Sequence, residues 1–220
     1  MRELVLIPGW GFDHRVWQPV AERLAGDFRI GYDLDAAPAG AVVCGWSLGA
    51  MRALKSAVAA HLARVILVGA TPRFLQAPDW PDAQPAELLD AFAAAIVTGA
   101  DPRAALRRFA ALLNQGDDHA RNLTRSLAAQ IDARIPDAAT LKAGLAELRD
   151  TDLRKSVVAI RQRTLLVHGE RDPLMPLSAA RWLADHLPDA RLEVFAGAAH
   201  APFLSQPDRF ADLVLSFANE

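Results

Sequence analysis

The sequence GWSLG at residues 45–49 is the first stretch whose residue types and spacing could carry covalent chemistry. An apolar run at residues 41–44 leads into it, and an alanine-rich helical stretch follows it. A serine on a sharp turn between a strand and a helix needs small neighbours, so that its hydroxyl projects above the sheet. The amino end of the helix favours the negative charge that develops during attack on a carbonyl. We therefore predict that Ser47 is a nucleophile.

A histidine must serve as the base, because a serine hydroxyl is a weak nucleophile until its proton is taken. His200 is the candidate, since it lies in a loop of small residues between the last predicted strand and the last predicted helix. Four other histidines fall on predicted helices or at their edges, where capping or solvent contact is the commoner role: His14, His61, His119 and His186. His168 ends a predicted strand, and we expect it to pack beneath the loop that follows.

A carboxylate must hold the histidine in the correct tautomer and stabilise its protonated form. Asp172 lies on the loop after the predicted strand 164–167, at the same end of the sheet as Ser47 and His200. Glu170, two residues earlier, is the competing acid. We favour Asp172 because an Asp-Pro pair commonly begins the kind of turn that presents such a group.

Two backbone N–H groups are expected to stabilise the tetrahedral intermediate of acyl transfer. The N–H of Leu48 directly follows the nucleophile, and the N–H of Trp10 belongs to a loop after the first predicted strand that should abut Ser47. An ordinary Gly-Pro turn is the alternative interpretation of the Trp10 loop. We predict an oxyanion hole formed by Trp10 and Leu48.

Six short apolar runs, separated by helical stretches, predict the elements that would position these residues. The predicted strands are residues 4–7, 29–32, 41–44, 65–68, 164–167 and 192–195. The predicted helices are residues 14–25, 48–61, 178–186 and 207–218. This alternation is typical of an α/β protein with a mostly parallel sheet covered by helices on both faces.

Residues 75–151 interrupt this alternation, because they are rich in Ala, Leu and Arg and have no strand pattern. We predict about four helices here, beginning near Asp101-Pro102 and Pro136-Asp137, with Gly99 and Gly116 in left-handed positions after helix ends. We call residues 75–151 the helical insertion. It is expected to form a lid over a core domain made of residues 1–74 and 152–220.

The connection between the second and third predicted strands is unusually short. A crossover between parallel strands normally takes a dozen or more residues, and only residues 33–40 are available here. Two explanations are open. Either the second strand is a very short edge strand, or the usual helix has been deleted and the chain crosses in extended form.

Composition limits the partners and the compartment. A formal net charge of -2 and a pI near 6.3 give no global basic field, so neither nucleic acid nor an anionic membrane is the expected partner. No apolar run approaches a membrane span, the amino terminus lacks a signal-peptide pattern, and the single cysteine, Cys44, is expected to be a buried thiol. We expect a cytoplasmic protein. No residue cluster has metal-ligand spacing, so neither a metal nor an organic cofactor is expected.

Together these pieces resemble the α/β-hydrolase superfamily, in which the nucleophile, the acid and the base follow one another in this order. The details look closest to the pimeloyl-[acyl-carrier protein] methyl ester esterases. The matching motifs are GWG at 9–11, GWSLG at 45–49, DWP at 79–81, TDLR at 151–154 and AHAPFLS at 199–205. The resemblance implies hydrolysis of the methyl ester of pimeloyl-[acyl-carrier protein], which releases methanol during biotin synthesis. It implies an acyl-carrier protein as partner, and we expect a monomer.

By the same resemblance, Phe109 and Leu113 would line an acyl channel beside Trp10, Leu48 and His200. Packing within the insertion is the alternative role for Phe109 and Leu113.

Four arginines of the helical insertion, as two pairs at helical spacing, could form a basic face for an acidic carrier protein: Arg103, Arg107, Arg121 and Arg125. Aspartates are interleaved with them, so a solvated helix surface is the alternative.

Two other functions remain open from the sequence. One is a general short-chain carboxylesterase with the same triad and a different lid. The other is a ligand-binding protein of the same fold that retains the triad without catalysis. The chain also lacks most of the segment that the resemblance predicts between Tyr32 and Ala41, which could open the pocket wall and change the acyl group that fits.

Overall fold

The computed structural model describes residues 1–57, 62–97 and 101–220, and these residues form one six-stranded sheet. The strand order is β2-β1-β3-β4-β5-β6, and every neighbouring pair is parallel. The strands are β1 (Arg2–Ile7), β2 (Phe28–Gly31), β3 (Val42–Trp46), β4 (Arg64–Val68), β5 (Arg163–Gly169) and β6 (Ala190–Phe195). All six predicted strands are present, so the predicted parallel α/β sheet is confirmed.

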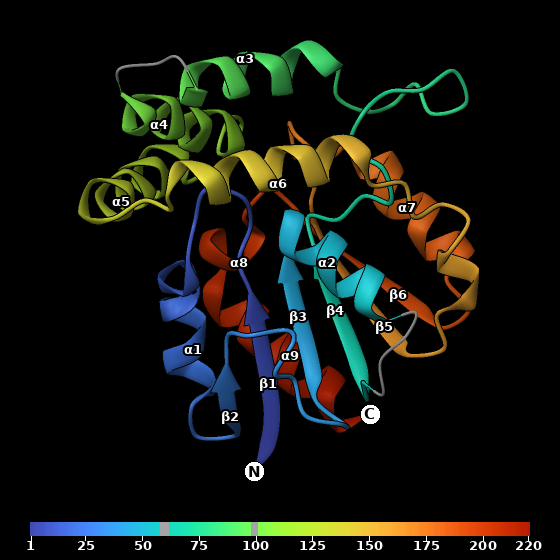
Figure 1. The fold of residues 1–220 in the computed structure, drawn as a ribbon. Helices are drawn as coiled ribbons and strands as arrows, with labels where there is room; N and C mark the ends of the chain where they lie inside the picture. The colour runs from blue at the N-terminus through green and yellow to red at the C-terminus, as the bar shows by residue number, and fades with distance from the viewer. Residues whose placement is uncertain (58–61, 98–100) are drawn as a thin grey trace.

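Helices cover both faces of this sheet, as predicted. Figure 1 shows α1 (Gln18–Leu24) and α9 (Pro207–Asn219) on one face, and α2 (Leu48–Ala57) and α7 (Leu177–His186) on the other. The central strands β3 and β4 are nearly continuous apolar runs because both of their faces are buried. The end of the predicted helix 48–61, with His61, lies outside the described residues.

Short helical turns appear where the sequence pattern indicated longer helices or none. The predicted helix 14–25 is a 3-10 turn, η1 (His14–Trp17), followed by α1. Two elements were not predicted, η2 (Val157–Ala159) and the one-turn α8 (Pro202–Ser205) directly after the His200 loop. They are too short to leave a helical periodicity in the sequence.

Four helices lie between β4 and β5, in the region predicted to be the helical insertion. They are α3 (Ala86–Val97), α4 (Pro102–Leu113), α5 (Ala120–Ala133) and α6 (Ala138–Asp150). The side chains of Asp101 and Asp137 accept the amide hydrogens of Ala104 and Thr140, so both predicted helix starts are confirmed. Gly116 has a φ of 88°, as predicted, and Gly99 lies outside the described residues. Figure 1 shows α6 crossing above the carboxyl ends of the central strands.

The two ends of the insertion are paired with each other. Arg73 and Asp152 form an isolated antiparallel bridge, and the N–H of Leu153 donates to the carbonyl of Pro72 at 2.8 Å. The chain therefore leaves and re-enters the sheet region at one place. We call these paired residues, 72–73 and 152–153, the junction of the insertion. The division into a core and a lid at residues 75 and 151 stays a prediction.

The DWP and TDLR motifs contact each other at this junction. Arg154 forms ion pairs with Asp152 (2.7 Å) and Asp79 (2.9 Å), and its guanidinium lies 5.6 Å from the ring centre of Trp80. The hydrogen bond from Arg154 lowers the pKa of Asp152 to about 2 and outweighs the opposing effect of burial. These motifs therefore fasten the insertion to the core.

The short connection between β2 and β3 follows a very short edge strand, as the first explanation states, and it crosses through turns and not in the extended form of the second. β2 has four residues at the edge of the sheet, and residues 33–40 contain turns and no helix. Two hydrogen bonds close these turns. The N–H of Ala37 donates to the carbonyl of Leu34, and the N–H of Ala41 donates to the carbonyl of Pro38. Leu34 and Ala37 pack against the core on the α2 face, so the chain crosses this face without a helix.

Candidate active site

Ser47 occupies a strained turn between β3 and α2. Its φ of 58° lies in the left-handed region, and among the described residues no other non-glycine residue has a positive φ. The N–H of Ser47 donates to the carbonyl of Val68 at 2.9 Å, and its carbonyl accepts from Ala50 and Met51. The neighbouring strand β4 and the first turn of α2 thus hold the turn from both sides.

Glycines on either side of Ser47 let three backbone segments approach one another. A Cβ at Gly45 would lie 2.2 Å from the carbonyl oxygen of Gly49, and a Cβ at Gly49 would lie 2.4 Å from that of Ile7. Non-bonded carbon and oxygen atoms do not approach one another this closely, so only glycine fits either position. The spacing of the GWSLG motif therefore has a steric cause.

His200 and Asp172 form a buried hydrogen bond. His200 Nδ1 lies 2.7 Å from Asp172 Oδ2, and both side chains have no exposed surface. Asp172 Oδ1 accepts the N–H groups of Leu174 and Met175, each at 2.9 Å. Burial alone would raise the pKa of Asp172, but the attraction and hydrogen bond of His200, with smaller contributions from His168 and Met175, hold it below its ordinary value. Asp172 is therefore a carboxylate at neutral pH.

The other ring nitrogen of His200, Nε2, is buried and has no hydrogen-bond partner within the described parts of the chain. It is the nitrogen that would exchange a proton with a substrate or a nucleophile. In structures without substrate such catalytic hydrogen bonds are often long and tighten only in the complex.

Glu170, the competing acid, has a different contact. Its side chain accepts a hydrogen bond from the N–H of Gly197 at 3.0 Å. Glu170 therefore stabilises the backbone near the His200 loop, while the imidazole itself is paired with Asp172.

His168 is buried beneath the Asp172 loop, as predicted. Its Nε2 lies 2.7 Å from the carbonyl oxygen of Met175 and 3.4 Å from Asp172 Oδ2. A carbonyl only accepts, so Nε2 carries the hydrogen. Burial lowers the pKa of His168 despite the nearby carboxylate. His168 is thus a neutral donor that secures the loop.

The backbone of His200 is held by two further contacts. The indole N–H of Trp46, the residue before Ser47, donates to the carbonyl of His200 at 2.8 Å. The N–H of His200 donates to the carbonyl of Leu113, at the end of α4, at 3.1 Å. The histidine is therefore tied both to the Ser47 turn and to the helical insertion.

The loop of one predicted oxyanion donor, Trp10, lies against Ser47, and the other predicted donor, Leu48, directly follows Ser47 in the chain. A Cβ added to Gly9 would lie 3.1 Å from the Cβ of Ser47, which brings the Trp10 loop directly against the serine. None of the hydrogen bonds found in the described residues uses the backbone N–H of Trp10 or Leu48. The indole of Trp10 donates to the carbonyl of Leu141 in α6 at 2.8 Å, which ties this loop to the insertion.

A small apolar cavity adjoins Ser47. Its free volume is about 10 Å³, room for about one water molecule. Of the predicted channel residues, Trp10 and Phe109 line it, whereas Leu48, Leu113 and His200 do not. Its other lining residues were not predicted from the sequence: Phe74, Leu88, Leu89, Phe92, Leu145, Leu148 and Leu174. The apolar spacing at 88, 89 and 92 was a usable signal.

Three of the four predicted docking arginines have hydrogen-bond or ion-pair partners within the insertion. Arg103 donates to the carbonyls of Ile131 and Asp132, at the carboxyl end of α5, and Arg107 pairs with the side chain of Asp132. Arg121 and Arg125 are exposed on α5, and Arg125 donates to Asn122 in the same helix.

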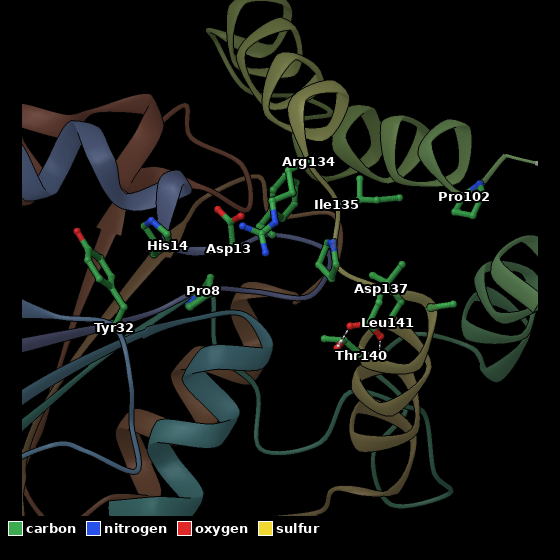
Figure 2. Close-up of a pocket in the computed structure, with 13 residues that line it drawn as sticks. Pro8, Asp13, His14, Tyr32, Pro102, Arg134, Ile135, Asp137, Thr140 and Leu141 are labelled. Carbon is green, nitrogen blue, oxygen red and sulfur yellow. Dashed lines mark hydrogen bonds between the residues drawn. The ribbon is translucent and has the colours of Figure 1, made fainter.

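A larger, open cleft of about 880 Å³ lies outside the Ser47 cavity. Figure 2 shows Pro8, His14 and Tyr32 of the core on one side of it, and residues 134–141 of the insertion on the other. Tyr32, at the start of the shortened connection, is 40% exposed. The effect of the short connection between β2 and β3 on the wall of this cleft stays a prediction.

Comparison with known proteins identifies the chain. It matches the α/β hydrolase family over residues 4–213. Two relatives named pimeloyl-[acyl-carrier protein] methyl ester esterase, from Aromatoleum aromaticum and Nitrosomonas europaea, are 39% and 35% identical to it. These alignments cover 96% and 94% of this chain, and 96% and 92% of the relatives. The chain belongs to the pimeloyl-[acyl-carrier protein] methyl ester esterase family of α/β hydrolases.

Solved structures agree with this family's fold. An esterase from Exiguobacterium antarcticum superimposes with a TM-score of 0.86 at 23% identity, over 100% of this chain and 92% of that one. A bromoperoxidase from Bacillus anthracis superimposes with a TM-score of 0.84 at 16% identity, over 100% of this chain and 93% of that one. These likenesses concern the fold alone, because one fold carries many chemistries. In the parts of this esterase-family chain that the structure describes, no helix is long and apolar enough to cross a membrane.

Replacing Gly45 by alanine should destabilise the protein, because the added methyl group would meet the Gly49 carbonyl. We expect the free energy of unfolding to fall by at least about 2 kcal/mol. Gly26→Ala is the matched control, since a Cβ there meets nothing within 4 Å. Urea unfolding of both variants measures the difference, and equal stabilities would refute the steric account.

Replacing His168 by glutamine should reduce the pH dependence of stability. The folded protein keeps His168 neutral, whereas the unfolded chain protonates it below about pH 6.5, so this residue lowers stability as the pH falls through that value. The glutamine side chain would keep a donor for the Met175 carbonyl and would not titrate. The loss of stability between about pH 7.5 and about pH 5 should shrink by at most about 2 kcal/mol. Urea unfolding at both pH values tests this, and an unchanged loss would contradict it.

Proposed function

We propose that this protein is a serine esterase that hydrolyses the methyl ester of pimeloyl-[acyl-carrier protein], acting as a cytoplasmic monomer. The observation that carries the proposal is the buried hydrogen bond between His200 and Asp172, beside a serine on a strained turn. The substrate is supported by relatives of that name at 39% and 35% identity over nearly the whole chain. The cytoplasm is supported by Cys44, a buried free thiol and the only cysteine of the sequence.

The proposed reaction has two halves. Ser47 Oγ attacks the ester carbonyl while His200 Nε2 takes the hydroxyl proton, and Asp172 stabilises the resulting imidazolium. The N–H groups of Trp10 and Leu48 donate to the oxyanion. When the intermediate collapses, His200 returns the proton to the leaving methoxide, and methanol departs from the acyl-enzyme.

Water completes the reaction by the same route. His200 Nε2 takes a proton from the water as it attacks the acyl-enzyme, and then returns a proton to Ser47 Oγ. The pimeloyl chain leaves as a free carboxylate, still attached to its carrier. Apart from water, these steps need only groups that the chain itself supplies.

The cavity beside Ser47 favours an uncharged substrate. Apart from Ser47, its lining side chains are apolar or aromatic, and they come from α3, α4, α6 and neighbouring loops. A methyl ester enters such a site at little cost, whereas a carboxylate loses its hydration without gaining a partner. The cavity therefore supports binding of the ester and release of the acid. An acyl chain exceeds the present free volume, so side chains that line the cavity must move to admit it.

Substitution of Ser47 by alanine should abolish hydrolysis. We expect the rate of methanol release from methyl pimeloyl carrier protein to fall by about 10⁴-fold or more, and Asp172→Asn to cost about 10⁴-fold. Thermal unfolding verifies that both variants are folded. Retention of the wild-type rate by Ser47→Ala would refute the mechanism. Equal wild-type rates on free methyl esters would instead indicate a general carboxylesterase.

Charge reversal on α5 tests the proposed carrier-docking set. Arg121 and Arg125 are exposed there, while Arg103 and Arg107 support them through contacts with the end of the same helix. The double variant Arg121→Glu/Arg125→Glu should lower kcat/KM for the carrier-linked ester by about 10-fold or more, because acidic carrier and basic face no longer attract. Hydrolysis of a free methyl ester should be unchanged. Arg181→Glu, on the exposed face of α7, is the control, and an equal loss in that variant would contradict docking on α5.

A further inference from the structure

The connection between α4 and α5 contains a buried carboxylate that the proposed reaction does not use. Asp117 is 7% exposed. Its Oδ2 accepts the N–H of Ala199 at 2.8 Å, and its Oδ1 accepts the hydroxyl of Ser205 at 2.9 Å and the N–H of His119 at 2.8 Å. A buried carboxylate with three donors is a strong, directed anchor, because hydrogen bonds to an ionised acceptor are shorter and stronger than neutral ones.

Two of these donors stand on either side of His200. Ala199 directly precedes it, and Ser205 ends the short helix α8 that follows it. Asp117 therefore binds the segment that carries the imidazole on both sides of His200. Since Asp117 belongs to the helical insertion and this segment belongs to the core, the contact joins the two regions at the catalytic loop.

Neighbouring residues form further hydrogen bonds between the same two regions. The N–H of Asp118 donates to the carbonyl of Gly197 at 2.9 Å, and the carbonyl of Leu113 accepts the N–H of His200. Arg171, next to Asp172, donates to the carbonyl of Gly116 and to the side chain of Asp118. The α4–α5 connection thus contacts both the base loop and the acid loop. Asp117 is the member of this set whose polar side chain is buried.

We infer that Asp117 is a positioning residue, which holds the His200 segment from the helical insertion so that the imidazole stays aligned with Asp172 and Ser47. The inference rests on the proposed function, in which His200 is the base. Without the carboxylate, the N–H of Ala199 and the hydroxyl of Ser205 lose their acceptor, and the segment between them can turn. A shift of the base by about 1 Å is enough to cost about 100-fold in rate.

Three variants separate positioning from general stability. Asp117→Ala removes all three acceptor contacts. Asp117→Asn keeps an oxygen for Ala199 and loses the charge. Leu127→Ala is the control, because this side chain is fully buried in α5 and loosens the same part of the insertion, but it has no polar group that could hydrogen-bond to the His200 segment.

Two measurements are made on each full-length variant. The first is kcat and KM on a free methyl ester, which excludes effects on carrier docking. The second is the downfield proton resonance of the His200 Nδ1–H in its hydrogen bond with Asp172, which needs no substrate.

For Asp117→Ala we expect kcat to fall by about 10- to 100-fold with KM within about twofold, and the Nδ1–H resonance to shift or broaden. Asp117→Asn should keep the resonance and show a smaller but measurable loss in kcat, of about 3- to 10-fold. Leu127→Ala should unfold more easily and keep both kcat and the resonance. If Asp117→Ala does not fold, an Asp117→Asn protein that matches Leu127→Ala in stability and in both readouts would refute the inference, while a selective loss of kcat would support it.

An unchanged resonance and kcat in Asp117→Ala would overturn the positioning role while leaving the proposed function intact. A wild-type protein that shows the resonance but hydrolyses no ester would instead refute the proposed function. The two failures are therefore distinguishable.

Discussion

The carboxylate of Asp172 is completely buried, and a charge in that place is tolerated only because its oxygens are surrounded by donors. Two backbone N–H groups of its own loop bind one oxygen, and the imidazole of His200 binds the other. The neutral ring of His168 stands 3.4 Å from that second oxygen. Removing any of these partners would leave a buried charge poorly paired, so the loop, the base and the end of β5 hold one another in position.

The parallel sheet explains how these partners meet. Ser47 follows β3, Asp172 follows β5 and His200 follows β6, and the carboxyl ends of parallel strands share one edge of a sheet. The helical insertion begins after β4, between the elements that carry Ser47 and Asp172, and so it lies over the same edge. Its contacts with Trp10 and with the His200 segment make it part of the frame that holds the site.

Features with a local cause could be predicted from the sequence. The turn at Ser47 depends on small residues at fixed spacing, and the central strands depend on continuous apolar runs, so both were found. The starts of α4 and α6 were found because Asp101 and Asp137 cap them through their own side chains. Asp172 was chosen over Glu170 from the Asp-Pro turn, and the hydrogen bond to His200 agrees with that choice.

Features that depend on how the insertion docks could not be predicted. The lining of the Ser47 cavity requires the rotation of α3 and α6 about their axes, which amphipathic spacing alone does not give. In the sequence Asp117 resembles any of several surface aspartates, because nothing in its own segment indicates that Ala199 and Ser205 lie against it. The contacts of Arg103 with the end of α5 are long-range in the same sense.

The most direct test of the account is the covalent intermediate itself. Attack by Ser47 on methyl pimeloyl carrier protein would join the two proteins through the pimeloyl chain until water cleaves the new ester. Acid quenching within one turnover, followed by intact mass spectrometry and peptide mapping, should reveal an adduct equal to both proteins less one methanol and attached at Ser47. Methanol release in a full turnover with no such adduct, or an adduct attached at another residue, would contradict the account.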